Sequence, residues 1–553
     1  MFRKPEEYTL KYFQPGQLAF FVSHPGLDGR KDSDINDLTR EFLKECDRKL
    51  KNNKLNNSKY ESANLSLISR HSFPAIQDME QPLNSELYAK RNQELPVKKG
   101  PRITARDESS LLFADIKGID NDPIKFLEFT DEFEQLLLEK QNANGLTLES
   151  VSLNWLTSGS PAPGGTGGPG GWPVAYRGSP HLAPYQFNLP AIVANSKKGK
   201  SVDVVILDTA PRSWDLKIAY KRYKDWHPLI HSMLRPDGPL KLYSAPLFER
   251  YRIADLRSLG HNYRMTDHGL FVAGIIHSIA PCANIHLIEV LNPYGVGDFR
   301  SIIRGLNFAL NRDFARNGNL KLPFVVNCSL TLNLPWKEDH LRTIVSKDED
   351  CFVDLYTDFD RRLEEMILKL VQKGIKNQVN AFEAIFDGIV AQNSRVIAAA
   401  GNDRRPGQET IPEARYPAAF DSVLGVGAIS RHPASINTGQ FKTASYSNKA
   451  DIPVNIGIAT IGGEEGEGEG VLGLYLGKFP GGEANRTKWA WWSGTSFATP
   501  VLSGISAALL SDKISSPSAW LDTYGDLYSG QSGIQNDQGQ SGEDVLPLTQ
   551  GII

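Results

Sequence analysis

The spacing of apolar residues predicts a small unit of helices and strands at the amino terminus. Between residues 126 and 137, apolar side chains recur at helical spacing and fall on one face, at Phe126, Phe129, Phe133, Leu136 and Leu137. The segments 146–148 and 151–155 alternate apolar and polar residues, as half-buried strands do. Residues 50–122 are polar and rich in Asn, Ser and Lys, which leaves their order open. We therefore expect an α+β unit over residues 1–157.

A run of small residues and prolines follows this unit. Residues 160–171 contain only Ser, Pro, Ala, Gly and Thr, a composition that forms neither helix nor strand. We place a linker at residues 158–185 and a second, larger domain at residues 186–512. The Ser-, Gly- and Gln-rich residues 513–553 are expected to be a disordered tail.

The second domain has the pattern of a parallel sheet. The run 202–207 is rich in β-branched apolar residues and the run 396–400 is wholly apolar, which is typical of strands buried on both faces. A stretch of small and apolar residues from the serine at 496 to about Leu510 predicts a helix. The length between these segments indicates insertions at about 217–256 and 336–393. Because functional groups collect at the carboxyl ends of parallel strands, the residues after these runs are the first candidates for a site.

Asp208, His268 and Ser496 are candidates for a catalytic triad. Ser496 lies in Gly-Thr-Ser-Phe-Ala-Thr-Pro, at the start of a helix, where backbone N–H groups favour developing negative charge. His268 opens the string His-Gly-Leu-Phe-Val-Ala-Gly, and Asp208 directly follows the mostly apolar run 202–207. A serine nucleophile needs a histidine base and a carboxylate that orients it, and the three can be far apart in sequence. Taken singly, each has a structural alternative: a helix cap, a core histidine or a turn residue.

Asn402 is the candidate for stabilising an oxyanion. It follows the run 396–400 and Gly401, so its side chain is expected at the same edge of the sheet. An amide N–H aimed beside the backbone N–H of Ser496 would stabilise negative charge on an attacked carbonyl oxygen. The alternative is an asparagine that tolerates a left-handed turn after Gly401.

Together these strings resemble the three signature blocks of the subtilisin-like serine proteases (subtilases, peptidase family S8), and they stand in that family's order of Asp, His and Ser. The resemblance covers about residues 195–512. It implies an α/β, subtilisin-like fold with a mostly parallel sheet and helices on both faces. It also implies that peptide bonds are hydrolysed through an acyl-enzyme. By the same resemblance, two segments bind an extended substrate: Ser329, Leu330 and Thr331, and Ala399, Ala400 and Gly401.

The sequence departs from the family's pattern at positions that carry no reacting group. Thr331 and Leu332 stand where glycine usually follows Ser-Leu, which is expected to reshape the pocket for the residue before the scissile bond. Ala210 and Leu270 replace the usual Gly and Thr. No cofactor is required for the chemistry. Structural calcium is implied by the family resemblance alone, because the Asp and Glu positions form no recognisable calcium loop.

Composition and charge agree with a globular enzyme that acts on proteins or peptides. Apolar residues make up 40% of the 553 residues and charged residues 23%, and the net charge is −3. This charge favours neither a nucleic-acid partner nor an anionic membrane. The amino terminus lacks the layout of a secretory signal, and the four widely spaced cysteines, one of them the buried-strand residue Cys328, suit reduced thiols. We therefore expect a cytoplasmic location and no metal site at the cysteines.

Two questions stay open at the level of sequence. Residues 1–157 suit either a propeptide-like inhibitor, cut at the Gly/Pro linker, or an interaction domain on a flexible tether. The whole chain is consistent with an active serine endopeptidase. The alternative is an inactive regulatory or binding protein of the same fold. Esterase or transacylase chemistry on the same triad is a third possibility.

Overall fold

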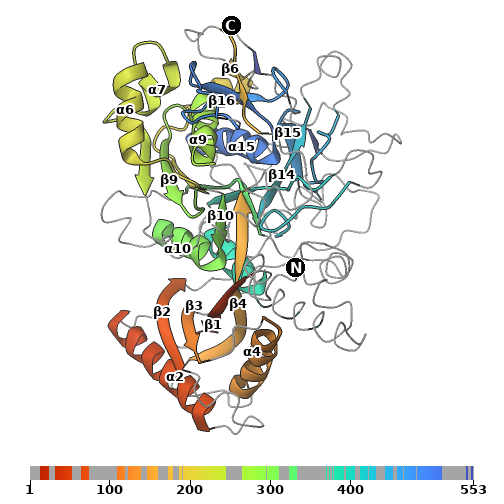
Figure 1. Ribbon diagram of the computed structural model, residues 1–553. Coiled ribbons are helices and arrows are strands. Elements are labelled where there is room, and N and C mark those ends of the chain that lie inside the picture. The colour runs from red at the N-terminus through yellow and green to blue at the C-terminus, as the bar shows by residue number, and fades with distance from the viewer. Residues whose placement is uncertain are drawn as a thin grey trace.

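The computed structural model of the chain shows two domains, a large one above and a small one below in Figure 1. The residues it describes are 13–23, 32–52, 64–73, 109–118, 123–138, 146–159, 172–178, 186–187, 189, 191–243, 265–293, 295–310, 323–332, 369, 373, 377, 379–390, 394–404, 411–420, 422–430, 442–451, 457–464, 466–480, 482–512, 544–545 and 550–551.

The large domain is built on a parallel sheet of eight strands in the order β18-β15-β14-β13-β11-β7-β9-β8. Strand order reverses around β7, whose neighbours are the later strands β9 and β11. Ligands of open α/β sheets bind at such a switch point, beyond the carboxyl ends of the strands. The strands are β7 (Asp203–Asp208), β8 (Leu240–Tyr243), β9 (Asn284–Glu289), β11 (Val325–Cys328), β13 (Arg395–Ala399), β14 (Leu424–Ile429), β15 (Gly457–Ile461) and β18 (Asp544–Val545).

Helices cover both faces of this sheet, because alternate side chains of each strand enter two different cores. In β7, Val204 and Ile206 pack in the core that includes α9 (His268–Ile279) and α15 (Thr495–Leu510). Val205 and Leu207 pack in the core that includes α10 (Phe299–Leu310) and the helix 379–390. The predicted α/β fold with a parallel sheet is confirmed.

Small residues let α9 and α15 lie close to each other and to the sheet. A Cβ atom added to Gly504 of α15 would lie 2.9 Å from the Cβ of Ile279, and one added to Gly269 would lie 2.2 Å from the carbonyl oxygen of Thr209. Neither position accepts a larger residue without a shift of the backbone. The first turns of both helices therefore meet the carboxyl edge of the sheet, where His268 and Ser496 stand.

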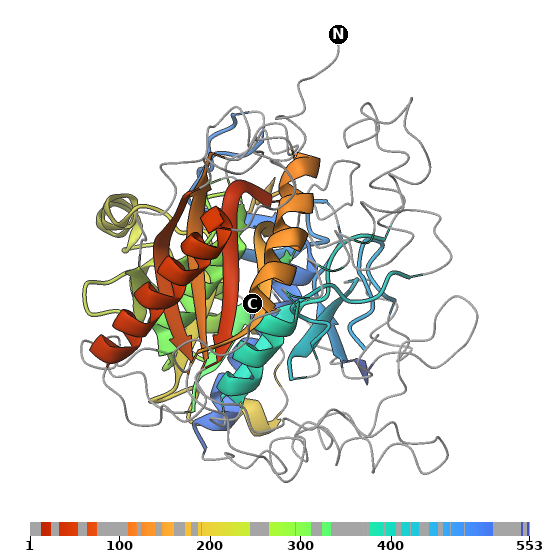
Figure 2. The same ribbon diagram turned by 90° about the horizontal axis from the view of Figure 1, so that it is seen from below.

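The small domain is an antiparallel sheet of four strands in the order β4-β1-β3-β2. Figures 1 and 2 show its two helices on the face turned away from the large domain. This βαββαβ order is that of a ferredoxin-like unit. Its elements are β1 (Phe13–Ser23), α2 (Asp32–Asn52), β2 (Asn64–Phe73), β3 (Ser109–Lys117), α4 (Pro123–Leu138) and β4 (Thr147–Gly159). The α+β unit is thus present, with β2 and β3 inside the polar stretch 50–122.

The two faces of the small sheet have different neighbours. Phe20 packs edge-on against Phe133 of α4, at 6.2 Å between ring centroids. On the other face, Phe113 packs against Phe299 of α10, at 5.5 Å. The two domains thus share one continuous apolar core, in which Phe299 also contacts Phe382.

Strand β4 extends beyond the small domain and enters the large one. Its last residues pair antiparallel with β10 (Val296–Asp298) on one edge and with β12 (Leu330–Leu332) on the other. The register places Thr157 opposite both Gly297 and Leu332, and Gly159 opposite Leu330. The carboxyl end of the amino-terminal unit is therefore a strand held on both sides by the large domain.

Several elements differ from the predicted linker and tail. The strand β4 runs to Gly159, and β5 (Val174–Ala175) pairs with β17 (Trp489–Trp492) beside β16 (Val471–Leu474), so the predicted linker 158–185 contains the end of one strand and the whole of another. In the predicted tail, β18 pairs with β15, and β19 (Gln550–Gly551) pairs with β6 (Gln186–Phe187). The expectation of disorder is wrong for these residues, because strand edges of the large domain supply their backbone with partners.

The first insertion, at 217–256, contributes part of α6 (Ser213–Tyr223), α7 (Pro228–Met233) and β8. A short helix, α5 (Ala191–Ala194), precedes β7. Most of the second insertion, 336–393, lies outside the described residues, apart from positions 369, 373 and 377 and the helix 379–390.

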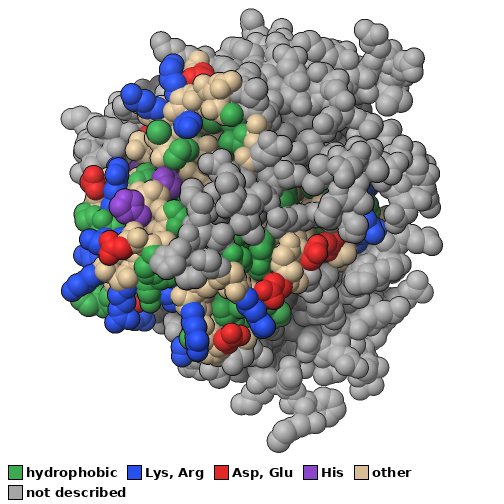
Figure 3. All heavy atoms as spheres, turned by 90° about the horizontal axis from the view of Figure 1, so that it is seen from above, with side chains coloured by type: hydrophobic (Ala, Val, Ile, Leu, Met, Phe, Trp, Pro, Cys, Tyr) green, Lys and Arg blue, Asp and Glu red, His purple; other side chains and the backbone are tan. Residues whose placement is uncertain are grey.

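The described surface carries charges of both signs. In the view of Figure 3, the described part of the surface shows both Lys and Arg side chains and Asp and Glu side chains. Among the residues described, no helix combines the length and the apolar character needed to span a membrane.

Candidate active site

Asp208 and His268 form a buried pair at the carboxyl end of β7. The Nδ1 atom of His268 lies 2.8 Å from Oδ1 and 2.9 Å from Oδ2 of Asp208, and neither side chain is exposed to solvent. Asp208 Oδ1 also accepts a hydrogen bond of 2.6 Å from the backbone N–H of Thr209. A carboxylate on Nδ1 favours the tautomer that carries its proton there, which leaves Nε2 as a base.

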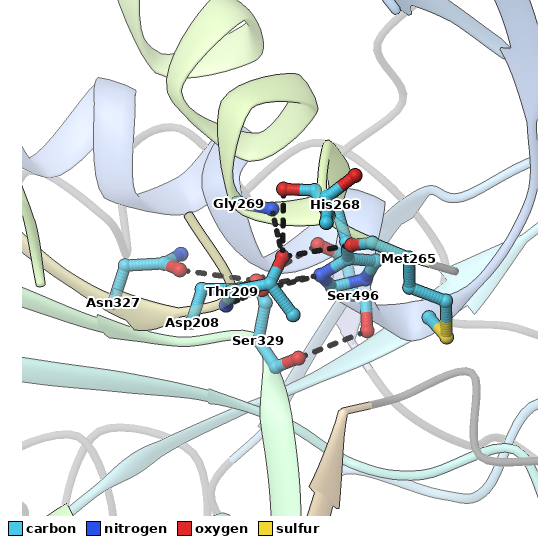
Figure 4. A network of polar contacts seen from close by, with 9 residues as sticks. Asp208, Thr209, Met265, His268, Gly269, Asn327, Ser329 and Ser496 are labelled. Carbon is cyan, nitrogen blue, oxygen red and sulfur yellow. Dashed lines mark hydrogen bonds and ion pairs between the residues drawn. The ribbon is translucent and has the colours of Figure 1, made fainter. Parts of the chain in front are cut away.

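Thr209 connects this pair to the loop before α9. Its hydroxyl donates to the carbonyl oxygen of Met265 at 2.8 Å and accepts from the backbone N–H of Gly269 at 3.2 Å. The end of β7 and the first turn of α9 are therefore joined on both sides of the Asp208–His268 contact (Figure 4). The orientation of the imidazole is set by the backbone of two elements.

Ser496 stands in the first turn of α15, beside this pair in Figure 4. Gly494 before it has φ 153° and ψ 157°, a conformation that only glycine adopts readily, so the sharp entry to the helix requires that residue. Ser496 Oγ donates to the carbonyl oxygen of Ser329 at 3.2 Å, and Ser329 Oγ donates to the carbonyl oxygen of Ser496 at 2.9 Å. The structure thus brings the serine to the segment after β11.

Aromatic rings enclose the imidazole of His268. The ring of Trp492 lies 5.4 Å from it, edge to face, and the ring of Phe497 lies 5.2 Å from it. Both aromatic side chains are buried, as is Ser496. Electrostatic interactions inside such a water-poor site are stronger than in water.

Asn402 follows β13 and contacts the residue before Ser496. Its Oδ1 atom accepts hydrogen bonds from the backbone N–H of Thr495 at 3.1 Å and from the Thr495 hydroxyl at 2.8 Å. Because an N–H group requires an acceptor, these contacts fix which end of the amide is oxygen. The Nδ2 end lies on the side of Gly494, 3.5 Å from the position of a Cβ added there. The donor of Asn402 and the start of α15 thus lie side by side.

Comparison with known families agrees with this arrangement. Residues 260–528 match the family model described as the subtilase family. The chain contains a subtilase domain. The matched part holds His268, Asn402 and Ser496, whereas Asp208 lies before it and is joined to the site by β7. The family is one of serine peptidases. A search of curated proteins gave no match.

The segments predicted to bind substrate lie beside the candidate site. Ser329 precedes β12 and contacts Ser496, while residues 399–401 lie at the end of β13. The strand β10 was not predicted. Its only sequence signal is the short glycine-containing string at 295–298, which carries no reacting group.

Asp267 is a second buried carboxyl beside the site, and sequence reasoning did not single it out. Its Oδ2 atom accepts hydrogen bonds from the backbone N–H groups of Leu476 at 2.9 Å and Gly477 at 2.5 Å. Burial raises the pKa of Asp267 from an ordinary 3.8 to about 6, although the two N–H groups oppose this shift. The side chain joins the first residue before α9 to a segment 210 residues further on.

The raised pKa of Asp267 predicts that its contribution to stability falls as the pH rises. The folded state binds the proton more tightly than the unfolded state, so the cost of burying the charge is absent below pH 3.8 and complete above about pH 6. Asp267→Asn keeps an acceptor without the charge. Relative to wild type, the variant is expected to gain about 2 kcal/mol between pH 4 and pH 7. Urea unfolding of both proteins at the two pH values measures this, and a constant difference would contradict it.

The described cysteines do not enter the site. Cys46, Cys282 and Cys328 are free thiols, and burial raises the pKa of Cys328. Within the described ranges, no three or more His, Cys, Asp or Glu side chains gather as a metal site.

Proposed function

We propose that this subtilase is a serine endopeptidase in which Asp208, His268 and Ser496 act as a triad. The observation that carries the proposal is the buried Asp208–His268 contact beside a serine at the start of α15. Ser496 Oγ attacks the peptide carbonyl while His268 Nε2 accepts its proton. His268 then protonates the leaving amine, and Asp208 stabilises the imidazolium. Water repeats the sequence on the acyl-enzyme. The side chains carry out these steps without a cofactor.

Asn402 and the backbone N–H of Ser496 stabilise the tetrahedral intermediate in this mechanism. Thr495 holds the amide oxygen of Asn402, so that Nδ2 is the atom directed toward Gly494 and the start of α15. A donor held in place before the reaction needs no reorganisation when negative charge develops.

Asn402→Ala is expected to lower kcat by about a hundred- to a thousandfold, the usual effect of losing one oxyanion donor. KM should change little, because the interaction is strongest in the transition state. Steady-state hydrolysis of a peptide substrate measures both constants. An unchanged kcat would assign Asn402 to the local turn alone.

We further propose that the amino-terminal unit inhibits the enzyme by occupying the place between β10 and β12 where an extended substrate would bind. The end of β4 is an extended segment between β10 and β12, and Gly159 pairs with Leu330, the neighbour of the Ser329 that contacts Ser496. Peptides commonly bind proteases by adding such a strand. The same segment therefore excludes a substrate. His268 and Ser496 are fully buried, which fits a closed state.

Polar contacts between the domains support a stable restrained state. Asn154, which is fully buried, donates to Gln17 at 2.8 Å and to Asp298 at 3.0 Å, and it accepts from the backbone N–H of Arg300 at 3.1 Å. Asp298 itself accepts from the backbone N–H of Ser301 at 2.7 Å, in the first turn of α10. Strand β4 is thus tied to the helix that follows β10.

Asn154→Leu is expected to increase hydrolysis by the uncut chain about tenfold or more. The change removes three hydrogen bonds, one of them to the buried carboxylate of Asp298, so the docked state loses stability. Ser66→Ala, at an exposed position of β2, is the matched control. Equal activity of the two variants would favour a tethered interaction domain over an inhibitor.

A regulatory protein without activity is the second candidate. The observation that favours it is the pairing of β4 with β10 and β12 beside the site. Full-length protein, Asn154→Leu and Ser496→Ala should be compared on peptides and on simple esters. The proposal predicts hydrolysis of both, dependent on Ser496. Ester hydrolysis alone would indicate an esterase, and neither reaction would indicate the regulatory role. A cytoplasmic location, suggested by the free thiols, remains part of the proposal.

A further inference from the structure

The solvent-facing side of α6 carries a tryptophan and two lysines. Trp214 lies in the first turn of the helix and is 68% exposed, the most of the large apolar side chains described. Lys217 and Lys221 follow three and seven residues later, a spacing that places them on the same side of the helix, and both are exposed. Ile218, half-buried, lies between them and the tryptophan. We call these four residues the basic face of α6.

Contacts on the opposite side hold α6 in place. Leu216 and Ala219 are buried in the core of the large domain. The ring of Tyr223 meets that of Trp226 edge-on at 5.3 Å between centroids, and the Nζ of Lys488 lies 5.0 Å from its centre. Figure 1 shows the helix at the outer edge of the large domain. The basic face is therefore presented to solvent in a fixed geometry, which lowers the entropic cost of binding a partner.

The charge of this segment is opposite to that of the whole chain. Residues 212–225 contain five Lys or Arg and two Asp, a net charge of +3, whereas the chain carries −3. Among the described residues, no carboxylate forms an ion pair with Lys217 or Lys221. Asp215 points about 100° away from Trp214 around the helix, and Asp225 lies beyond the helix end. Both lysines are thus available to a negatively charged partner.

An acidic peptide segment with an apolar residue is the partner that fits this face. Its carboxylates would pair with the two lysines, and its apolar side chain would pack on Trp214, because exposed tryptophans commonly anchor protein interfaces. From Trp214 to Lys221 the face is about 10 Å long, which matches about three residues of an extended chain. An anionic membrane fits less well, since Leu216 and Ala219 are already buried in the core and little apolar area remains to enter a bilayer.

The basic face lies close to the candidate active site along the chain. Helix α6 begins at Ser213, five residues after Asp208 at the end of β7. Five residues span at most about 18 Å, so a polypeptide bound at the site can reach the helix with a short further segment. A protein held at both places would bind more tightly than one held at the site alone.

We propose that the basic face of α6 binds an acidic segment of the protein that this subtilase cleaves, away from the scissile bond. The inference rests on the proposed peptidase function. It predicts a substrate class: proteins with Asp or Glu beside an apolar residue, a short distance along the chain from the cleaved bond. Because the contact is the same before and during the reaction, it lowers KM and leaves kcat unchanged.

Binding is tested by fluorescence anisotropy on full-length Ser496→Ala, which does not cut the probe. The probe is a labelled peptide of Glu and Leu, and the comparison peptide has Gln in place of every Glu. We expect the Glu peptide to bind about tenfold more tightly, with a difference that shrinks as salt is added. Equal affinity for the two peptides would overturn the inference whatever the variants show. Binding to phosphatidylserine vesicles without binding of the Glu peptide would also overturn it.

Two variants in the same background locate the binding. Trp214→Ala and Lys217→Glu/Lys221→Glu should each lower the affinity for the Glu peptide about tenfold or more, since one loses the aromatic anchor and the other repels the peptide. Lys200→Glu/Lys241→Glu makes the same change of charge at two exposed positions before and beyond α6 and is the matched control. An equal loss in the control would assign the effect to net charge and contradict a site on α6.

The role in substrate choice is tested by hydrolysis with Ser496 intact. One peptide substrate is compared with and without an added Glu/Leu segment, and the segment should lower KM about tenfold in the wild type but not in Lys217→Glu/Lys221→Glu. Hydrolysis of both peptides with equal KM would overturn this inference alone. Binding without hydrolysis of either peptide would overturn the proposed function and, with it, the role of the basic face in substrate choice.

Discussion

Ser496→Ala is expected to lower turnover by about a millionfold, the loss that removal of the nucleophile causes in subtilisin. The reason is that the other parts of the site cannot form the acyl-enzyme without the hydroxyl. Stability should change by about 1 kcal/mol or less, because Ser496 Oγ makes a neutral hydrogen bond to the carbonyl oxygen of Ser329. Hydrolysis of a fluorogenic peptide by the purified variant measures the loss.

Ser506→Ala is the control for this experiment. Ser506 lies in the same helix, is also buried, and donates to the carbonyl oxygen of Leu502 at 2.7 Å. Its loss removes a similar hydrogen bond without touching the pair Asp208–His268, so activity per folded molecule should stay within a few-fold of wild type. Near-normal proteolysis by Ser496→Ala would show that a different group attacks the substrate.

Asp208→Asn is expected to lower kcat by about ten-thousandfold. The amide would present an N–H group to His268 Nδ1, where the carboxylate now accepts at 2.8 and 2.9 Å. The imidazole would then place its proton on Nε2, which could no longer accept the proton of Ser496. Single-turnover acylation measures the effect directly.

Asp203→Asn is a matched control at the other end of the same strand. Asp203 Oδ1 lies 2.8 Å from Nε2 of His286, and both side chains are buried. The substitution alters a buried Asp–His contact in β7 without reaching Ser496. We expect it to change stability but to leave kcat per labelled site unchanged. An equal loss of kcat in both variants would mean that Asp208 serves only the fold.

The parts of the fold that the sequence predicts are those coded by local pattern. The strands β7 and β13 are apolar at their central positions because both of their faces are buried. By contrast, β2 was not predicted, because it is an edge strand whose Ser66 and Leu67 are exposed. The strands β5, β18 and β19 are two residues long, and only distant partners define them.

The candidate site also has parts that local sequence predicts and parts that it does not. Asp208, His268, Asn402 and Ser496 each stand in a short string with its own signal, and the structure brings all four to one edge of the sheet. The contacts of Asp267 with Gly477 and of Gly159 with Leu330 join segments with no shared pattern. Such pairings depend on the folded backbone, so they could not be predicted from local sequence.

Intact-mass analysis after treatment with a fluorophosphonate tests the central claim most directly, because the probe reacts with a serine that its base has activated. The account predicts one adduct per chain of the full-length protein, formed faster in Asn154→Leu and absent in Ser496→Ala. No adduct on either the wild type or Asn154→Leu, or an equal adduct on Ser496→Ala, would contradict the assignment of Ser496 as the nucleophile.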